Sequence, residues 1–225
     1  MSRPEHARGK KAAIDTYRER RQKAAGWLRE QDLAAAVLVD FEGLRNASVR
    51  YLTGHPMDAL LLLFADGRCL LVPWDVPLAE AKASVEEIVP YTRFGRSVVS
   101  SLKELLPQRK LGSVELSGAF PYPRVQQLIQ LLPDNEILCR KGGIDAHLAG
   151  LRAVKDEEEI AALRCAGSLS DELVAAAGQL LAGGREVSET ELALFLENEA
   201  RSRGAEGMGF ETLAAGPSRS FALHS

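Results

Sequence analysis

Cysteine is scarce in this sequence, and the few cysteines present do not form a pattern. Three cysteines occur in 225 residues, at positions 69, 139 and 165, and no two of them form a C-x-x-C pair. An odd number of widely spaced cysteines predicts neither a disulfide framework nor a thiolate zinc site. This usage is typical of a chain that folds in the reducing cytoplasm.

Long apolar segments and a strong net charge are also missing. The longest apolar run, ALLLLFA at residues 59–65, is far shorter than the roughly 20 residues that a membrane-spanning helix needs. The first residues, MSRPEHARGKK, are polar and lack the apolar core of a signal peptide. We therefore expect a soluble cytoplasmic protein with no membrane partner.

The net charge of −3 gives no general attraction to nucleic acid. One basic stretch near the front, from Arg8 to Lys23, could serve as a nucleic-acid arm or as the solvated face of a helix. Because no aromatic platform accompanies it, the helix interpretation is favoured and no nucleic-acid partner is expected.

Common catalytic and metal-binding motifs are absent: the sequence has no H-E-x-x-H, no G-x-S-x-G, no Walker loop and no EF-hand loop. Its four histidines lie too far apart for any two to share a helical turn, so no local metal or cofactor site is predicted. His6 is interpreted as a solvated terminal residue, His147 as a structural residue in a connector, and His55 as a loop residue beside a buried strand. His224 has the surroundings most typical of a catalytic residue.

Two acidic groups are weaker candidates for chemistry. The run from Asp156 to Glu159 can be an acid cluster, but negative charge is favoured at any helix N-terminus, which is the simpler interpretation. Asp40 and Glu42 follow a predicted strand and could face a cleft, although two carboxylates alone are a weak signal.

The first 150 residues alternate between helical and strand-like patterns, which predicts an α/β domain with a mixed sheet. Its clearest local feature is a hairpin, because Asp66-Gly67 separates two apolar runs and supplies the positive φ angles of a tight turn. The predicted helices lie at 8–31, 76–84, 96–106 and from Pro121 or Pro123 onward; the predicted strands lie at 34–40, 87–92, 112–116 and 136–139.

Residues 151–225 follow a different pattern, of two helices and then strand-like segments. Asp156 with Glu159, and Ser188 with Glu191, have the spacing of a capping box at the start of a helix. FETLAAG (210–216) is predicted as a strand, followed by a turn at 216–220 and a second strand that begins at Phe221. One strand and two helices cannot bury much core, so this region is expected to be the incomplete start of a second, α+β domain.

Three stretches together resemble one family. NASVRYLTGHPMDALLLLFADGRCLLVP (46–73) is similar to the N-terminal domain of creatinases and prolidases, where an Asn, a Tyr-Leu-Thr-Gly and a hairpin recur in this order. LRAVKDEEEIAALRCAG (151–167) resembles the junction helix of Xaa-Pro aminopeptidases and prolidases. VSETELALFLENEARSRGAEGMGFETLAAGPSRSFALHS (187–225) resembles the opening of their pita-bread catalytic domain.

The resemblance implies a creatinase/prolidase N-terminal domain at 1–150 and a truncated pita-bread domain at 151–225. It implies a metallopeptidase that removes the residue ahead of proline or splits Xaa-Pro dipeptides, using two divalent ions of Mn, Co or Zn. The family's five metal ligands lie downstream of the segment that contains His224, so this chain alone is expected to bind no metal and to be inactive. His224 matches a histidine that contacts substrate, and a homodimer acting on proline-containing peptides is implied.

Two alternatives remain open. The chain could be a non-catalytic binding or dimerisation module that pairs with a full-length partner. It could also be a fragment of a creatinase-type hydrolase, which works without metal.

Overall fold

The computed structural model describes residues 3–41, 44, 46–106 and 112–221, with side chains from residue 16 onward. The chain divides into two compact units, Met1–Val154 and Lys155–Ser225. No helix within the described ranges has both the length and the apolar content needed to cross a bilayer.

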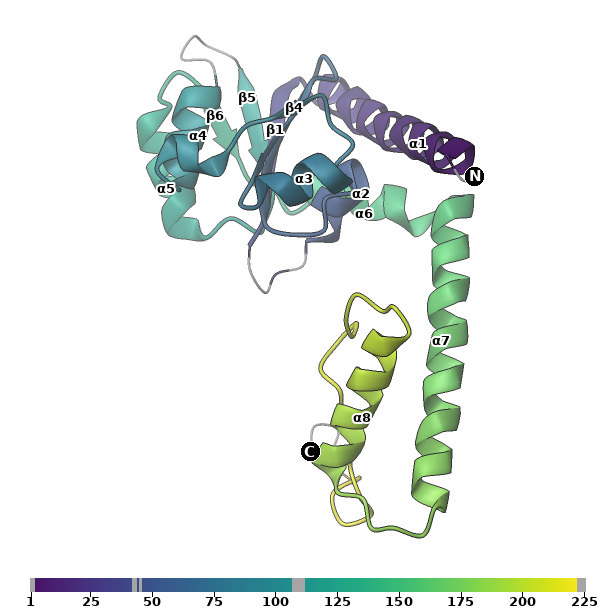
Figure 1. Ribbon diagram of the computed structural model, residues 1–225. Helices are drawn as coiled ribbons and strands as arrows, with labels where there is room; N and C mark the ends of the chain where they lie inside the picture. The colour runs from purple at the N-terminus through teal and green to yellow at the C-terminus, as the bar shows by residue number, and fades with distance from the viewer. Residues whose placement is uncertain (1–2, 42–43, 45, 107–111, 222–225) are drawn as a thin grey trace. The chain divides into compact units, whose positions relative to one another are not determined.

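The first unit is built on a six-stranded mixed sheet in the order β4-β3-β2-β1-β5-β6 (Figure 1). β2 pairs antiparallel with both β1 and β3, whereas the other neighbouring strands are parallel. This confirms the predicted α/β class and the mixed sheet. The strands are β1 (Leu33–Asp40), β2 (Ala59–Phe64), β3 (Cys69–Pro73), β4 (Glu87–Ile88), β5 (Ser113–Leu116) and β6 (Glu136–Leu138).

The β2–β3 hairpin forms where the sequence predicts it, with Leu63 opposite Cys69 at the turn. Only one of the two turn residues has the expected conformation: Gly67 has φ +91°, but Asp66 is not among the described residues with positive φ. The Gly67 amide donates to the Phe64 carbonyl, and the Asp66 carboxylate accepts from the Arg68 amide. An aspartate that binds its own turn in this way needs no left-handed backbone.

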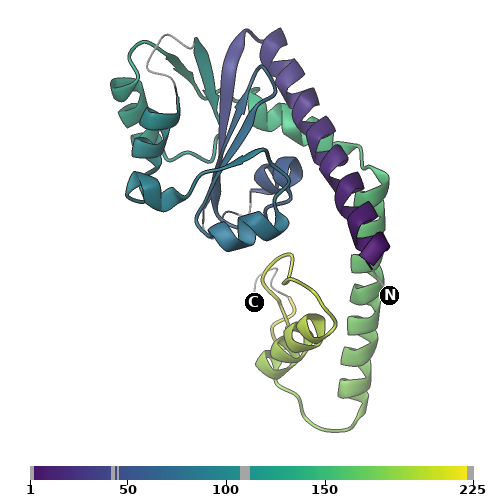
Figure 2. The same cartoon turned by 45° about the horizontal axis from the view of Figure 1, so that its top comes forward.

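Alternation along the strands sends side chains to two separate cores. One core contains Val37, Val39, Leu62 and Val72 and is covered by α4 and α5. The other contains Leu38, Leu61 and Leu71 and is covered by α1, α2, α3 and α6. Figure 2 shows the sheet lying between these two groups of helices. The helices of this unit are α1 (Arg3–Glu30), α2 (Ala47–Thr53), α3 (Val76–Lys82), η1 (Tyr91–Phe94), α4 (Val98–Leu105), α5 (Tyr122–Leu131) and α6 (Ile144–Ala153).

Three local features of this unit differ from the sequence analysis. The strand predicted at 87–92 ends at Ile88, because Pro90 has no N–H with which to extend the ladder, and η1 follows it. Helix α2, which lies between an Asn46 cap and Gly54 at φ +76°, was not predicted; His55 follows it on a loop, as predicted. Helix α6 occupies the predicted connector around His147, because its apolar face packs on α1 and α2.

The basic stretch at the front is only partly a solvated helix face. Arg18 and Lys23 are exposed on α1, as predicted, but Arg20 and Arg21 are buried. Their guanidinium groups donate to the main-chain carbonyls of Tyr51 and Leu52 at the end of α2. The sequence of the basic stretch does not indicate that these two arginines are buried, because the carbonyls that compensate their charge belong to a different helix.

The second unit contains α7 (Glu157–Ala182) and α8 (Glu189–Ser202), which pack against each other. Both helices start with the predicted capping boxes: Asp156 accepts from the Glu159 amide and Ser188 from the Glu191 amide, with each glutamate bonding back to its cap. The ordinary role of the acidic run at 156–159 is thus a helix start.

The strand predicted at 210–216 is wrong. Residues 211–216 have no regular secondary structure, and residues 217–220 form a turn in which the Arg219 and Ser220 amides donate to the Gly216 carbonyl. A strand needs a neighbour for its backbone groups, and the described part of this unit contains none. The strand expected to start at Phe221 runs into residues outside the described ranges.

Candidate functional site

The sheet topology gathers polar and aromatic residues at one edge. β1, β3, β4, β5 and β6 all run in one direction, and β2 alone runs against them. The carboxyl ends of five strands therefore meet at one edge, where ligands of open α/β sheets bind. We call this the carboxyl edge; the loops that follow β1 and β3 and the loop that precedes β2 lie there.

Alternation gives the two sides of this edge different chemistry. Asp40, the last residue of β1, has the parity of Leu38 and belongs to the side covered by α1 and α2. Phe41 follows with the opposite parity and packs on the core under α4 and α5. The α1–α2 side is therefore polar at the edge, and the α4–α5 side is aromatic.

On the polar side, Asp40 is buried and fixes the loop that begins α2. Its Oδ1 accepts from the Asn46 amide at 2.7 Å, while the Asn46 side chain donates to the Val39 carbonyl at 2.8 Å. Across β2, Asp75 caps α3 by accepting from the Leu78 amide at 3.0 Å. Both carboxylates thus have backbone partners, and both act electrostatically on His55.

His55 is the least expected member of the polar side. It is only 1% exposed, and among the described residues neither ring nitrogen has a partner in full hydrogen-bond geometry, although the Asp58 backbone lies close enough to act on its pKa. Burial lowers the pKa of His55, and the Asp58 backbone, Asp75 and Asp40 only partly oppose that effect. The imidazole is therefore held neutral near pH 7, a form that can accept one proton and donate one hydrogen bond.

The buried imidazole makes folding sensitive to pH. The ordinary pKa of 6.5 applies to the unfolded chain and a lower pKa to the folded chain, so the unfolded state binds the extra proton. The free energy of unfolding should be greatest above pH 6.5 and should decrease as the pH falls toward the folded pKa, by at most about 1.4 kcal/mol per pH unit for one proton. His55→Gln should remove the part of this pH dependence of stability that His55 causes.

The measurement is urea unfolding of both proteins between about pH 8 and about pH 5. The His55→Gln curve should be flatter than the wild-type curve. His147→Gln is the comparison variant: burial also lowers the pKa of His147, in α6, so its curve should be flatter only by the share that His147 itself contributes. Parallel curves for wild type and His55→Gln would contradict a neutral buried His55.

On the aromatic side, Trp74 stacks on Tyr91 with ring centroids 4.0 Å apart, and Phe41 meets Trp74 edge-on at 6.2 Å. The guanidinium of Arg124, in the first turn of α5, lies 5.9 Å from the centre of the Phe41 ring. We call these four residues the aromatic patch. Burial raises the pKa of Tyr91, with Arg124 opposing it, so the phenol stays neutral and serves as a support for Trp74.

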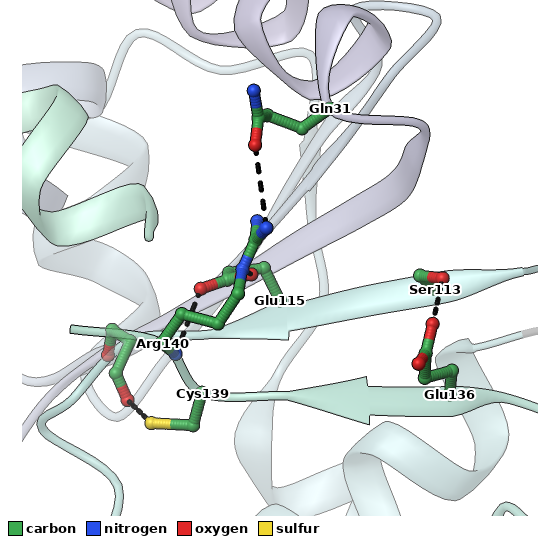
Figure 3. Close-up of polar contacts among 7 residues, drawn as sticks. Gln31, Ser113, Glu115, Glu136, Cys139 and Arg140 are labelled. Atoms are coloured by element: carbon green, nitrogen blue, oxygen red, sulfur yellow. Dashed lines mark hydrogen bonds and ion pairs between the residues drawn. The ribbon is translucent and has the colours of Figure 1, made fainter. Parts of the chain in front are cut away.

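Further along the edge, Glu115 of β5 and Arg140 after β6 form an ion pair (Figure 3). The Glu115 carboxylate is fully buried and accepts from Arg140 Nε at 2.7 Å and from the Arg140 amide at 3.2 Å. Next to it, Cys139 Sγ lies 3.8 Å from the Ser117 carbonyl. Burial, then Glu115 and Asp145, raise the pKa of Cys139, so this thiol is a poor nucleophile.

The sequence-predicted site residues have different outcomes. His224, the predicted catalytic residue, and Glu42 lie outside the described residues, and His6 lies before the first described side chain. His147 is structural, as predicted, but it lies in α6, stacked on Trp27 at 5.1 Å. Among the described residues no three His, Cys, Asp or Glu side chains lie close enough together to hold a metal ion.

Sequence reasoning missed the aromatic patch and the Glu115–Arg140 pair. A signal for the patch existed, because Trp74 and Phe41 each stand directly after an apolar strand end, where parallel strands place functional loops. No sequence pattern indicates a role for Arg124 or Glu115, because the residues that they contact, Phe41 and Arg140, are distant from them in the sequence.

The comparisons agree with this fold. The Creatinase/Prolidase N-terminal domain matches residues 20–154. A prolidase from Pyrococcus horikoshii OT3 superposes with a TM-score of 0.70 at 21% identity, covering 92% of this chain and 55% of that one. An X-Pro aminopeptidase from Thermotoga maritima MSB8 superposes with a TM-score of 0.67 at 20% identity, covering 84% of this chain and 51% of that one. An Xaa-Pro dipeptidase from Bacillus anthracis superposes with a TM-score of 0.64 at 21% identity, covering 86% of this chain and 51% of that one.

The chain thus spans about half the length of each of these solved structures. No curated protein matches the chain. The structural likeness, at these identities, is a likeness of fold, and the domain match covers more than half of the 225 residues. By this match and by its mixed sheet, the chain belongs to the Creatinase/Prolidase N-terminal domain family.

Proposed function

We propose that this chain is the N-terminal domain and the opening of the catalytic domain of a metal-dependent Xaa-Pro aminopeptidase or Xaa-Pro dipeptidase. The observation that carries the proposal is the extent of the structural likeness. It covers 84–92% of the chain in structures named as prolidase, aminopeptidase and dipeptidase, whereas the family domain ends at residue 154. The likeness therefore continues into the second unit, which we assign to the start of a pita-bread domain.

In this proposal His224 contacts the peptide beside the metals, and the protein cleaves the bond ahead of proline. Paired divalent ions can generate hydroxide and polarise an amide carbonyl, which is chemistry a lone histidine does not supply. The described residues do not fit such a centre, because they contain no cluster of three ligand side chains. We therefore assign the metal ligands to other parts of the enzyme and expect this chain alone to be inactive.

A binding or dimerisation module is the second candidate, and one observation favours it. Large apolar side chains are exposed in the second unit: Leu163, Val174, Leu181, Leu194, Phe210, Leu213 and Phe221. Exposed apolar side chains in such numbers mark surfaces that a partner or another segment covers. A homodimer is compatible with both candidates; a creatinase-type hydrolase would work without metal.

The test uses the native protein purified from its source cells, assayed on Ala-Pro with Ala-Ala as the control dipeptide. We expect an intact mass well above 24.4 kDa and cleavage of Ala-Pro alone, lost on chelation and restored by Mn²⁺. His224→Ala in that protein should lower kcat by about 10²-fold or more, as expected for a group that handles protons.

Each alternative gives a different result. Cleavage that survives chelation would favour a creatinase-type mechanism. A native mass of 24.4 kDa with no cleavage of either dipeptide would contradict the peptidase proposal and favour the module.

A further inference from the structure

One face of α7 is apolar and exposed. Residues three or four positions apart share a face of a helix, and this spacing connects one row of residues along the whole of α7. We call this row the α7 seam: Ile160, Leu163, Gly167, Ser170, Val174, Gly178 and Leu181. Its three large exposed members, Leu163, Val174 and Leu181, are 57%, 72% and 52% exposed. The α7 seam is therefore a surface suited to being covered by another apolar surface.

Helix α8 packs on a different side of α7 (Figure 1). On that side Leu173 is buried, and Glu172 pairs with Arg203 of α8 at 2.9 Å. Because successive residues of an α-helix are rotated by about 100°, Leu173 and Glu172 lie about 100° and 160° around the helix axis from Val174. Within the described part of the second unit, the α7 seam is thus left uncovered.

Two glycines form holes in the α7 seam. Among the described residues, a Cβ added to Gly167 or Gly178 would meet no atom of another segment within 4 Å. Each glycine lies one helical turn after a large exposed side chain, Gly167 after Leu163 and Gly178 after Val174. The seam therefore alternates knobs and holes, and such a surface can interlock with a second helix.

The pattern of the α7 seam is complementary to itself when two helices run antiparallel. The centre of such a pair lies just after Ser170. Leu163 of one helix is then opposite Gly178 of the other. By the same two-fold symmetry, Val174 is opposite Gly167. A parallel pair in register would instead place glycine opposite glycine and leave the holes empty, which protein interfaces avoid.

The charges of α7 favour the same orientation. Its first turn is acidic, with Glu157, Glu158 and Glu159, and its last turn has no basic residue. A parallel pair would bring two acidic turns together. An antiparallel pair keeps them at opposite ends of a 26-residue helix, about 39 Å apart, and also aligns the two helix dipoles favourably.

We propose that the α7 seam binds the α7 seam of a second copy of this chain, in an antiparallel pair. Leu163 and Val174 of each copy fill the spaces above Gly178 and Gly167 of the other. The occupant is a second copy because the knobs and holes of the seam match the same seam turned by a two-fold axis, which is the condition for an isologous dimer. This inference does not rest on the proposed function.

The test is sedimentation velocity of the 225-residue chain between about 1 and about 500 µM. We expect the 24.4 kDa monomer to convert to a dimer of twice that mass, with a dissociation constant of about 10 µM. A chain that stays monomeric throughout this range, or that only aggregates without a discrete dimer, would overturn the proposal. The occupant of the seam would then be another segment of a longer protein.

Gly167→Leu tests the holes. The added side chain takes the space that Val174 of the second copy needs, so the dissociation constant should rise at least about tenfold. The monomer should keep its fold, because leucine favours a helix more than glycine does and no other described segment lies in its way. A seam that associates only because it is apolar would bind more tightly after this change, which would contradict the proposal.

An exchange of two residues is the matched control. Gly167→Val combined with Val174→Gly keeps the composition of α7 and again places a valine opposite a glycine. The dissociation constant of this double variant should return to within about threefold of the wild-type value. Val174→Gly alone removes the knob and should weaken the dimer about tenfold. A double variant that binds no better than the single variants would overturn the antiparallel register.

A cross-link tests the centre of the pair. Ser170 lies beside its own copy across the two-fold axis, so Ser170→Cys, with Cys139→Ser and Cys165→Ser, should be joined by a short bismaleimide into a covalent dimer. The control is Cys139→Ser alone, which keeps Cys165, about 140° around the helix from Ser170. It should give no covalent dimer. Equal cross-linking of both proteins would exclude this interface.

One contact in the pair is unfavourable and gives a further check. Asp171 also lies beside the two-fold axis, so the pair brings two copies of this exposed carboxylate near each other. Asp171→Asn should therefore tighten the dimer about twofold, whereas a looser dimer would contradict the proposed centre. None of these measurements uses a peptide substrate, so the dimer and the cleavage of Ala-Pro can each fail without the other.

Discussion

Replacing Arg140 by methionine should lower the free energy of unfolding of the N-terminal unit by about 2–4 kcal/mol. Methionine keeps much of the side-chain volume but removes the guanidinium from the fully buried Glu115 carboxylate. That carboxylate then keeps the backbone amide of residue 140, at 3.2 Å, as its recorded donor. Arg140 itself is 38% exposed, so water can reach the site in part, which places the expected cost below that of a fully buried pair.

Replacing Glu115 should lower the free energy of unfolding less than replacing Arg140. Glu115→Gln keeps the shape and one carbonyl oxygen, and it leaves Arg140 at a position that water can reach, so we expect about 1 kcal/mol. The local packing depends on that shape, because a Cβ on Gly143 would lie 1.8 Å from Glu115 Oε1. Urea unfolding followed by Trp27 fluorescence measures both changes, since the Arg140 guanidinium lies 5.9 Å from the Trp27 ring.

A double-mutant cycle separates the pair from its surroundings. The double variant should be more stable than the sum of the two single changes predicts, because it no longer buries an unpaired carboxylate. Equal costs for Arg140→Met and Glu115→Gln, with no coupling between them, would show that the ion pair does not compensate the buried charge.

Arg21→Met should be the second large effect, with a loss of about 2–4 kcal/mol. Arg21 is 3% exposed on its side chain and joins three segments: Nη1 donates to the Leu52 carbonyl at 3.0 Å and to the Ser84 carbonyl at 2.6 Å, and Nη2 pairs with Glu86 at 3.0 Å. Leu52 lies in the last turn of α2, where carbonyls lack helical partners and positive charge is favourable. Methionine would leave both carbonyls unsatisfied.

Two variants control for charge and for helix propensity. Arg21→Lys keeps the charge but lacks the planar fork that reaches both carbonyls, so an intermediate loss is expected. Arg29→Met changes the same residue type on the same helix, where one guanidinium nitrogen donates to the Ala65 carbonyl at an exposed site, and should cost less than about 1 kcal/mol. If Arg21→Met and Arg29→Met cost the same in urea unfolding, Arg21 has no special role in holding α2.

Much of the fold could be predicted from the sequence because its signals are local. The β2–β3 hairpin depends on a glycine between two apolar runs, and α7 and α8 begin at capping boxes only four residues long. Strand alternation also determines that Asp40 and Phe41 face opposite sides of the sheet. Each of these features depends on residues only a few positions apart, so a single sequence is enough to predict it.

Tertiary structure alone decided the features that depend on distant partners. Arg21 is buried because carbonyls 31 and 63 residues away accept from it, and Glu115 because Arg140 lies 25 residues further on. His147 is helical because α6 packs against α1, where Trp27 stacks on it. Residues 211–216 are not a strand, although their pattern suggests one, because a strand forms only where another strand accepts its hydrogen bonds. Burial of charge and pairing of strands are properties of contacts between segments, and sequence patterns within one segment do not encode them.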